Sequence, residues 1–150
     1  MAQIAKISEQ VHLKSSAHKV YDFLKNKMDF VIQMFPDIYK GCDVLEGNGF
    51  SHGSIIHLKY NLGSPAEVKE RIAIDDANKS ITFECLEGDV FRDFEVFKLK
   101  IQVFDNGSNG SSVDWSIEFV KANEDVPPPH SYLIFADKIS KGLDDYLCNN

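Results

Sequence analysis

The chain has few of the residues that cross-link a fold or hold a metal ion. Its three cysteines, Cys42, Cys85 and Cys148, are too few and too widely spaced for a disulfide framework or a CxxC metal site. HExxH zinc motifs, Walker phosphate loops and nucleophile elbows are absent from the sequence as well. We therefore expect reduced thiols, no bound metal and no cofactor, and we disfavour metal-dependent or nucleotide-dependent catalysis.

Long apolar runs and an excess of positive charge are also missing. No uncharged apolar run comes near the ~20 residues that cross a bilayer, so we expect no membrane span. The formal net charge of −7, with no cluster of Lys and Arg, repels phosphate backbones and argues against nucleic acid as a partner. The first residues, Met1 to Lys6, lack a basic start followed by an apolar stretch, which predicts a cytoplasmic protein.

What is present is the composition of one globular domain. The chain is 150 residues long, 43% hydrophobic and 26% charged, which is typical of a folded protein. This length is near the usual size of a domain, and no repeat, linker or low-complexity segment divides it. We expect a single domain over residues 1–150 that is a monomer or a weak dimer.

The N-terminal part of the sequence predicts a strand followed by two short helices. Apolar residues recur with the two-residue period of a strand over residues 5–13. Ser15 or Ser16 is a suitable N-cap for the helix that follows. A second short helix begins at Met28 and must end before Pro36, because the residue that precedes a proline avoids the helical conformation.

The middle of the chain predicts a succession of strands with almost no helical pattern. Glycine-containing or polar turns separate the apolar segments, and several of these segments alternate strictly between apolar and polar residues. Strands are expected at residues 39–46, 54–60, 68–74, 80–86, 97–103 and 113–119. Together with the first strand they form a seven-stranded antiparallel sheet.

Near the C-terminus the apolar residues change to three- and four-residue spacing, which predicts a long helix from Tyr132 to Leu147. Three prolines at 127–129 fit ahead of this helix or in its first turn. A single helix must then cover one face of a large sheet, so the sheet must curl around it in an α+β fold. Periodicity alone does not decide whether the interior is solidly packed or hollow.

Five short segments in order carry a resemblance that covers nearly the whole chain. They are DVLEGNG at 43–49, VKERI at 68–72, DANKSITF at 76–83, LEGD at 86–89 and NEDVPPP at 123–129. Each motif alone is weak, whereas all five in this order are specific. On these residues the chain resembles the major latex protein-like branch of the plant pathogenesis-related class ten and birch-pollen-allergen family.

The resemblance implies a helix-grip fold of the START-like type, with a large internal cavity closed by the C-terminal helix. Members of the family bind or carry hydrophobic plant compounds such as flavonoids, cytokinins, sterols, lipids and terpenoids. Some relatives are enzymes of specialised metabolism that carry out Pictet–Spengler condensation, alkaloid isomerisation or iridoid cyclisation.

Two family features do not transfer to this chain. The acid, lysine and tyrosine set of the alkaloid-condensing relatives cannot be placed residue by residue, so that reaction is not carried over. The glycine-rich loop of the family holds Phe50, Ser51 and His52 here, which reduces the backbone groups available for an anion. We therefore do not assign nucleotide binding.

The inward-facing residues of the sheet and of the C-terminal helix become the predicted lining of a ligand cavity. This set comprises Ile56, Leu58, Tyr60, Glu70, Ile81, Phe83, Cys85, Phe97, Leu99, Ile101, Trp115, Ile117, Phe119, Tyr132, Phe135 and Ile139.

Polar residues on apolar faces are the candidates for chemistry, because burial without a partner costs roughly 1–3 kcal/mol. Glu70 and Glu9 each share a face with apolar residues. A carboxyl group against an apolar wall has a raised pKa and can exchange protons with a bound carbonyl compound. The alternative is that each faces water at a bend or pairs with Arg71, Lys6 or a tyrosine. Tyr60 and Tyr132 present phenols to a ligand or satisfy backbone carbonyls, and Glu70 and Tyr60 are the candidate acid and base.

Three functions remain open at this stage. The first is binding of a small hydrophobic metabolite, a terpenoid, flavonoid, sterol, lipid or hormone-like compound, in an internal cavity. The second is a cofactor-free enzyme that encloses a reactive iridoid or alkaloid intermediate and directs its cyclisation or isomerisation. The third, a defence protein that acts through protein partners, has no evident apolar surface patch to support it.

Overall fold

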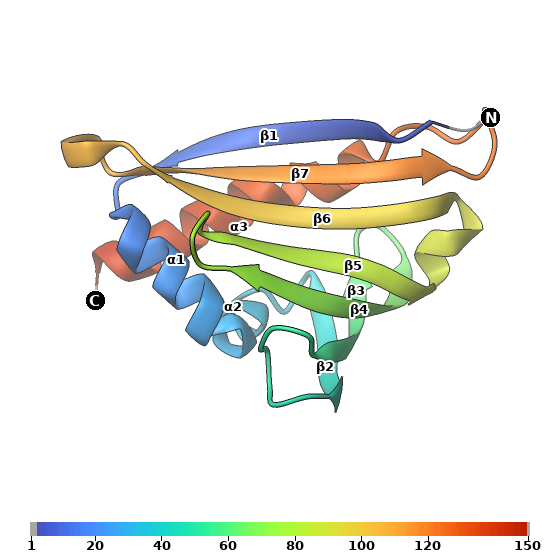
Figure 1. The fold of residues 1–150 in the computed structure, drawn as a ribbon, viewed down its shortest axis with the longest axis horizontal. Helices are drawn as coiled ribbons and strands as arrows, with labels where there is room; N and C mark the ends of the chain where they lie inside the picture. Colours follow the sequence, from blue (N-terminus) through green and yellow to red (C-terminus); the bar gives the residue numbers. More distant parts are fainter. Residues whose placement is uncertain (1–2, 150) are drawn as a thin grey trace.

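A computed structural model describes residues 3–149 as one curled sheet with three α-helices (Figure 1). The elements follow in the order β1 (Ala5–Leu13), α1 (Ala17–Asn26), α2 (Met28–Met34), β2 (Tyr39–Glu46), β3 (Ile55–Asn61), β4 (Pro65–Asp75), β5 (Ser80–Gly88), η1 (Asp89–Arg92), β6 (Phe94–Asp105), η2 (Gly107–Asn109), β7 (Ser111–Lys121) and α3 (His130–Cys148). The predicted order of strands and helices is confirmed, and several strands extend a few residues beyond the predicted ends.

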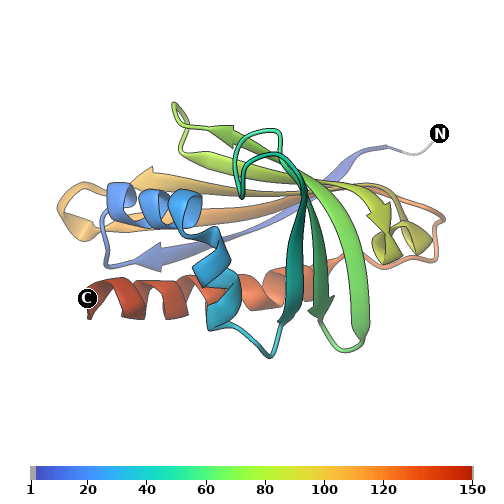
Figure 2. The same cartoon turned by 90° about the horizontal axis from the view of Figure 1, so that it is seen from below.

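The seven strands form one antiparallel sheet in the order β1-β7-β6-β5-β4-β3-β2. The sheet bends strongly, so that β2, β3 and β4 run steeply across the direction of β1, β7 and β6 and wrap toward α3 (Figure 2). Breaks in register accompany the bend, between Lys69 and Glu70 on β4 and between Phe94 and Val96 on β6. An extra residue on one strand increases local bending and twist, which helps a sheet of this size to curl.

The helices begin and end where the sequence provides a cap or a proline. The side chain of Ser16 accepts a hydrogen bond from the backbone N–H of Lys19 and caps α1. Helix α2 ends at Met34, two residues before Pro36. The three prolines lie ahead of α3, with Pro129 as its N-cap residue. Local chemistry thus accounts for the start of α1, the end of α2 and the start of α3.

The glycine-containing loop between β2 and β3 is tied to β4 by its own polar groups. The N–H of Gly53 donates to the carbonyl of Ile72 at 2.7 Å, and Nδ1 of His52 accepts from the N–H of Ile74 at 2.9 Å. Two polar groups of the loop are therefore used within the fold.

Apolar residues along the whole of α3 pack against the sheet, and polar contacts fix its C-terminal half. Leu143 and Leu147 are buried, and the indole N–H of Trp115 on β7 donates to Oγ of Ser140 at 2.8 Å. The carboxylate of Asp144 accepts from the backbone N–H groups of Lys14 and Ser15, at 2.9 and 3.0 Å. This carboxylate joins α3 to the turn that connects β1 with α1.

Along residues 3–149, no helix is both long enough and apolar enough to cross a membrane.

Replacement of Asp144 by Asn tests the importance of this link. Burial opposes the ionisation of Asp144, but the N–H groups of Lys14 and Ser15 outweigh it and hold its pKa below the usual value. An amide has only one acceptor oxygen, so we expect Asp144→Asn to lower the free energy of unfolding by about 1.5–3 kcal/mol in urea titrations at pH 7.

The neighbouring exposed residue provides the control, since Asp145→Asn should leave the free energy of unfolding unchanged within ~0.5 kcal/mol. A lowered pKa stabilises the fold only where the carboxyl is ionised. The difference between wild type and Asp144→Asn should therefore be full above pH ~4 and shrink as the pH falls below it. Equal free energies of unfolding for Asp144→Asn and Asp145→Asn at pH 7 would contradict the assigned role of Asp144.

Candidate functional site

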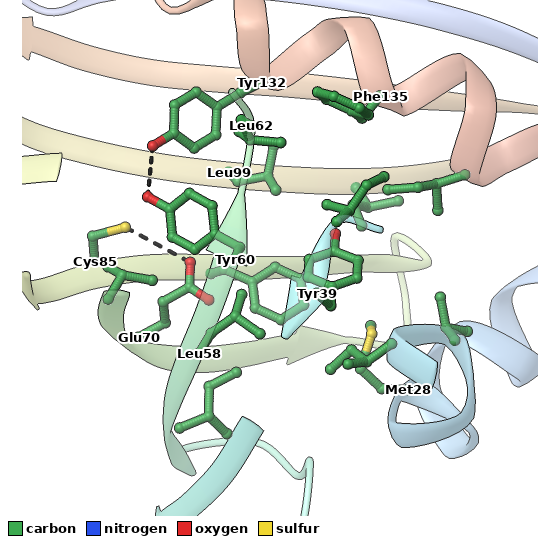
Figure 3. A pocket seen from close by; sticks show the side chains of 18 of the residues that line it. Met28, Tyr39, Leu58, Tyr60, Leu62, Glu70, Cys85, Leu99, Tyr132 and Phe135 are labelled. Atoms are coloured by element: carbon green, nitrogen blue, oxygen red, sulfur yellow. Dashed lines mark hydrogen bonds between the residues drawn. The ribbon is translucent and has the colours of Figure 1, made fainter. Parts of the chain in front are cut away.

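An internal cavity of about 100 Å³ lies between α3, the two short helices and the concave face of the sheet (Figure 3). Its lining is almost entirely apolar. The polar side chains along it are those of Tyr39, Tyr60, Glu70, Cys85 and Tyr132. An apolar cavity with a few convergent polar groups is the usual form of a small-molecule site.

Glu70 points into this cavity because of its place on β4. The residues on either side of it in the same alternation, Val68 and Ile72, are buried, and Glu70 lies opposite Ile56 on β3 and Cys85 on β5. Its side chain is 7% exposed. A carboxyl group on the concave face of the sheet is thus enclosed by apolar neighbours.

The carboxyl group of Glu70 has one weak partner and no counter-ion among residues 3–149. The thiol of Cys85 donates to its Oε2 at 3.7 Å, whereas Arg71, the next residue, pairs with Glu84 at 3.6 Å. Burial raises the pKa of Glu70 to about 7, and the hydrogen bond from Cys85 opposes this only in part. Glu70 is therefore a neutral acid below pH 7 and exchanges its proton near neutral pH.

Two tyrosines meet across one end of the cavity. The hydroxyl groups of Tyr60 on β3 and Tyr132 on α3 are hydrogen-bonded at 2.6 Å, and the ring of Tyr132 packs against Phe97 with centroids 4.8 Å apart. Burial raises the pKa of both phenols. Because one hydroxyl of such a pair donates to the other, the accepting hydroxyl keeps its own hydrogen for another acceptor.

The thiols near the cavity are protonated and poorly nucleophilic. Burial, followed by the influence of Glu70, raises the pKa of Cys85 far above its usual value and that of Cys42 to about 11. Since the thiolate is the reactive form, covalent catalysis by these cysteines is disfavoured. Below pH 7 every polar group of the cavity is then uncharged, which suits an uncharged ligand that carries a hydrogen-bonding group.

Most of the residues predicted to line the cavity do line it. These are Ile56, Leu58, Tyr60, Glu70, Phe83, Cys85, Phe97, Leu99, Ile101, Trp115, Tyr132, Phe135 and Ile139. Whether they bind a ligand stays a prediction. Glu70 and Glu9 each share a face with apolar residues in the sequence, but only Glu70 is buried, and Glu9 is exposed.

Three predicted residues, Ile81, Ile117 and Phe119, are buried but do not line the cavity. Ile81 borders a small separate void beneath α1, and Phe119 packs edge-on against Phe94, with ring centroids 5.7 Å apart. Ile117 is fully enclosed between Ile7 and Leu99, its partners in register on the adjacent strands. Facing inward on a strand therefore does not by itself place a side chain on the cavity wall.

Sequence reasoning missed several lining residues, most of them on the two short helices, in loops or on the edge strand β2. They are Leu24, Met28, Val31, Ile32, Ile38, Tyr39, Leu62, Val68 and Val90. The apolar stripes of the two short helices were visible in the sequence, but helical periodicity does not tell a side chain packed on the sheet from one that faces a void.

Within residues 3–149, no group of three or more His, Cys, Asp or Glu side chains lies close enough together to hold a metal ion. The site geometry therefore offers proton exchange at Glu70 and hydrogen bonding by phenols, in an apolar enclosure.

Comparisons with known proteins agree with this architecture. The family model of the pathogenesis-related protein Bet v 1 family matches residues 2–150. MLP-like protein 34 of Arabidopsis thaliana is 36% identical over 144 residues, which is 94% of this chain. The chain spans about half the length of that relative, 46%.

Solved structures show the same fold. Major latex-like protein 151 from Panax ginseng superposes with a TM-score of 0.87 at 30% identity, covering 95% of this chain and 97% of the other. A Thalictrum norcoclaurine synthase point mutant in complex with a transition-state analogue has a TM-score of 0.79 at 17% identity, covering 97% of this chain and 98% of the other. The second likeness shows the fold alone. The curled sheet, the gripping helix, the internal cavity and the match over residues 2–150 together show that this chain belongs to the Bet v 1 family of pathogenesis-related proteins.

Proposed function

We propose that this protein binds a small, uncharged hydrophobic metabolite in its internal cavity. The observation that carries the proposal is the apolar cavity whose polar groups, Glu70, Cys85, Tyr39 and the two hydrogen-bonded tyrosines, are neutral below pH 7. An apolar wall excludes water and charge, and the few polar groups can orient a hydroxyl or carbonyl group of the ligand.

Burial of apolar ligand surface supplies the affinity at ~25 cal/mol per Å². About 200 Å² of apolar surface gives roughly 5 kcal/mol by this relation. Hydrogen bonds to Glu70 or a tyrosine add to it, and the loss of ligand freedom offsets part of the sum. This combination of apolar burial with a few hydrogen bonds supports a terpenoid, flavonoid, sterol, lipid or hormone-like compound as the ligand. The free cysteines Cys42, Cys85 and Cys148 support a role inside the cell, where thiols stay reduced.

A second candidate function is acid-catalysed cyclisation or isomerisation of a reactive intermediate held in the same cavity. The observation that favours it is a buried carboxyl group with a pKa of about 7 in a cavity that also holds the phenol of Tyr60 (Figure 3). A catalytic acid works best with a pKa near the operating pH, and an enclosed site protects an intermediate from water. Glu70 would give a proton to the oxygen of a carbonyl compound, or to the nitrogen of an imine to form the iminium ion, and Tyr60 would hold the same oxygen or nitrogen before the proton is transferred.

The binding proposal is tested by filling the cavity. Leu99 lines it, and Leu99→Trp should occupy the space that a ligand needs. For wild type, 1-hexanol at tenfold its Kd should stabilise the fold by about 1.4 kcal/mol, a rise of roughly 3–6 °C in Tm. We expect this rise to vanish in Leu99→Trp.

Phe104→Trp gives the matched control, because Phe104 lies on the same strand and is exposed. This variant should keep the full response to 1-hexanol in the same thermal-shift measurement. An equal response of the two variants would place the bound molecule outside the cavity and overturn the proposal.

The ionisation of Glu70 is tested by the pH dependence of stability. The pKa of Glu70 is about 7 in the fold and ~4.3 in an unfolded chain, so between these values the folded protein holds a proton that the unfolded chain has lost. The free energy of unfolding must then decrease as the pH rises from about 5 to 8, by roughly 2–3 kcal/mol from this group.

Glu70→Gln removes the ionisable group and should lack this decrease, whereas Glu95→Gln, at an exposed position, should retain it. Urea denaturation of the three proteins at pH 5 and pH 8 measures the difference. If the free energy of unfolding changes by the same amount between pH 5 and pH 8 in wild type and in Glu70→Gln, Glu70 is not held protonated in the fold.

The enzyme candidate is tested by turnover of a dialdehyde or iminium substrate, followed by product analysis. Glu70→Gln should slow turnover by about 10²–10⁴-fold while the affinity for an unreactive ligand changes little. The wild-type rate should fall as the pH rises through 7, because the acid must be protonated. If the product profiles of a panel of such intermediates are the same with and without the protein, the enzyme candidate is overturned and ligand binding remains as the proposed function.

A further inference from the structure

A second hollow lies against the outside of the internal cavity. It has a volume of about 310 Å³ and is formed by the turn before β4, by η1 and by the prolines ahead of α3. We call it the outer pocket. The residues used below are Ser64, Asp89, Arg92, Asp93 and Ser131, all of which line it.

The outer pocket and the cavity have a common wall. Tyr60, Leu62, Val90 and Tyr132 line both of them. The hydrogen bond of 2.6 Å between the hydroxyls of Tyr60 and Tyr132 lies in this wall (Figure 3). The tyrosine pair is thus a partition between an apolar interior and a more polar hollow at the surface.

The sizes of the two spaces show why the partition matters. Sites for small molecules usually measure ~300–1000 Å³, and the cavity, at about 100 Å³, is well below that range. The outer pocket alone, at about 310 Å³, reaches only its lower end. A ligand larger than a few carbon atoms therefore needs space on both sides of the tyrosine pair.

The charges of the outer pocket indicate which ligand end it accepts. Arg92 and Asp89 pair at 2.9 Å, and Asp89 also accepts the backbone N–H of Glu67. Asp93 is left as an excess negative charge at this pocket, which repels an anionic group and accepts hydrogen bonds from a hydroxyl. Ser64 and Ser131 add two more hydroxyl groups.

We propose that the cavity and the outer pocket form one site for an elongated amphipathic molecule, with its apolar body inside and an uncharged hydroxyl-bearing end in the outer pocket. The molecule passes between Tyr60 and Tyr132, and its own polar groups replace the hydrogen bond that they make with each other. This inference rests on the proposed function and adds the ligand class to it.

The test compares a short alcohol that fits the cavity with a longer one that needs both spaces. Each buried methylene contributes ~0.8 kcal/mol, a factor of about four in Kd, so 1-decanol should bind wild type at least ~30-fold more tightly than 1-hexanol. Ser131→Phe and Ser64→Phe narrow the outer pocket from two different walls. Each should reduce the advantage of 1-decanol at least tenfold and leave 1-hexanol unchanged.

Phenylalanine keeps Trp115, which lines the cavity, as the only tryptophan, so its fluorescence can report binding in all variants. Ser108→Phe, in the exposed turn at the opposite end of the sheet, is the matched control and should behave as wild type (Figure 1). Decanoate at pH 6, where Glu70 is still protonated, should bind at least tenfold more weakly than 1-decanol, and Asp93→Asn should narrow that gap.

The outcomes separate the two proposals. Failure of 1-hexanol to bind wild type would overturn the proposed function itself. Binding of 1-hexanol with a 1-decanol advantage that survives both Ser131→Phe and Ser64→Phe would leave binding in the cavity intact and overturn the joint site. Decanoate binding as tightly as 1-decanol would overturn the assignment of the hydroxyl-bearing end.

Discussion

The site depends on how α3 is attached to the sheet. Its C-terminal half is held by the Asp144 carboxylate and by the hydrogen bond between Trp115 and Ser140, and it packs closely there. Its N-terminal half contributes Tyr132 and Phe135 to the cavity wall instead. Polar contacts thus hold one end of the helix, while the other end both packs on the sheet and contributes side chains to the cavity wall. Because Trp115 itself lines the cavity, its bond to Ser140 fixes α3 beside the ligand space.

The enclosure also explains the chemistry of Glu70. A carboxyl group at the same position on a flat sheet would face water or a neighbouring cation, as Arg71 and Glu84 do on the opposite face. The break in register between Lys69 and Glu70 accompanies the bend of β4, so the feature that helps to curl the sheet also lies beside its most perturbed acid. The bend of β4 and the raised pKa of Glu70 thus occur at the same point of one strand.

Much of the fold could be predicted from sequence periodicity, and the site only in part. Alternation identified the strands and placed Leu58, Phe83 and Leu99 on the concave face, because strand geometry leaves a side chain only two directions. It could not place Ile117 in solid core and Leu99 on the cavity wall, although the two are register partners. That distinction depends on the distance between helix and sheet, which arises from many side chains at once. The contribution of α1 and α2 to the wall was missed for the same reason.

The pairing of β1 with β7 has a consequence for how the protein is made. β1 is synthesised early, yet its partner is the last strand, so that Gln10 and Asp114 bond across 104 positions of sequence. During translation β1 must wait until β7 has been synthesised, and such long-range pairing is slow to form. Helix α3 follows β7 and closes the interior last. A growing chain on the ribosome therefore exposes its apolar concave face until α3 has been synthesised, which makes this interval favourable for chaperone capture or aggregation.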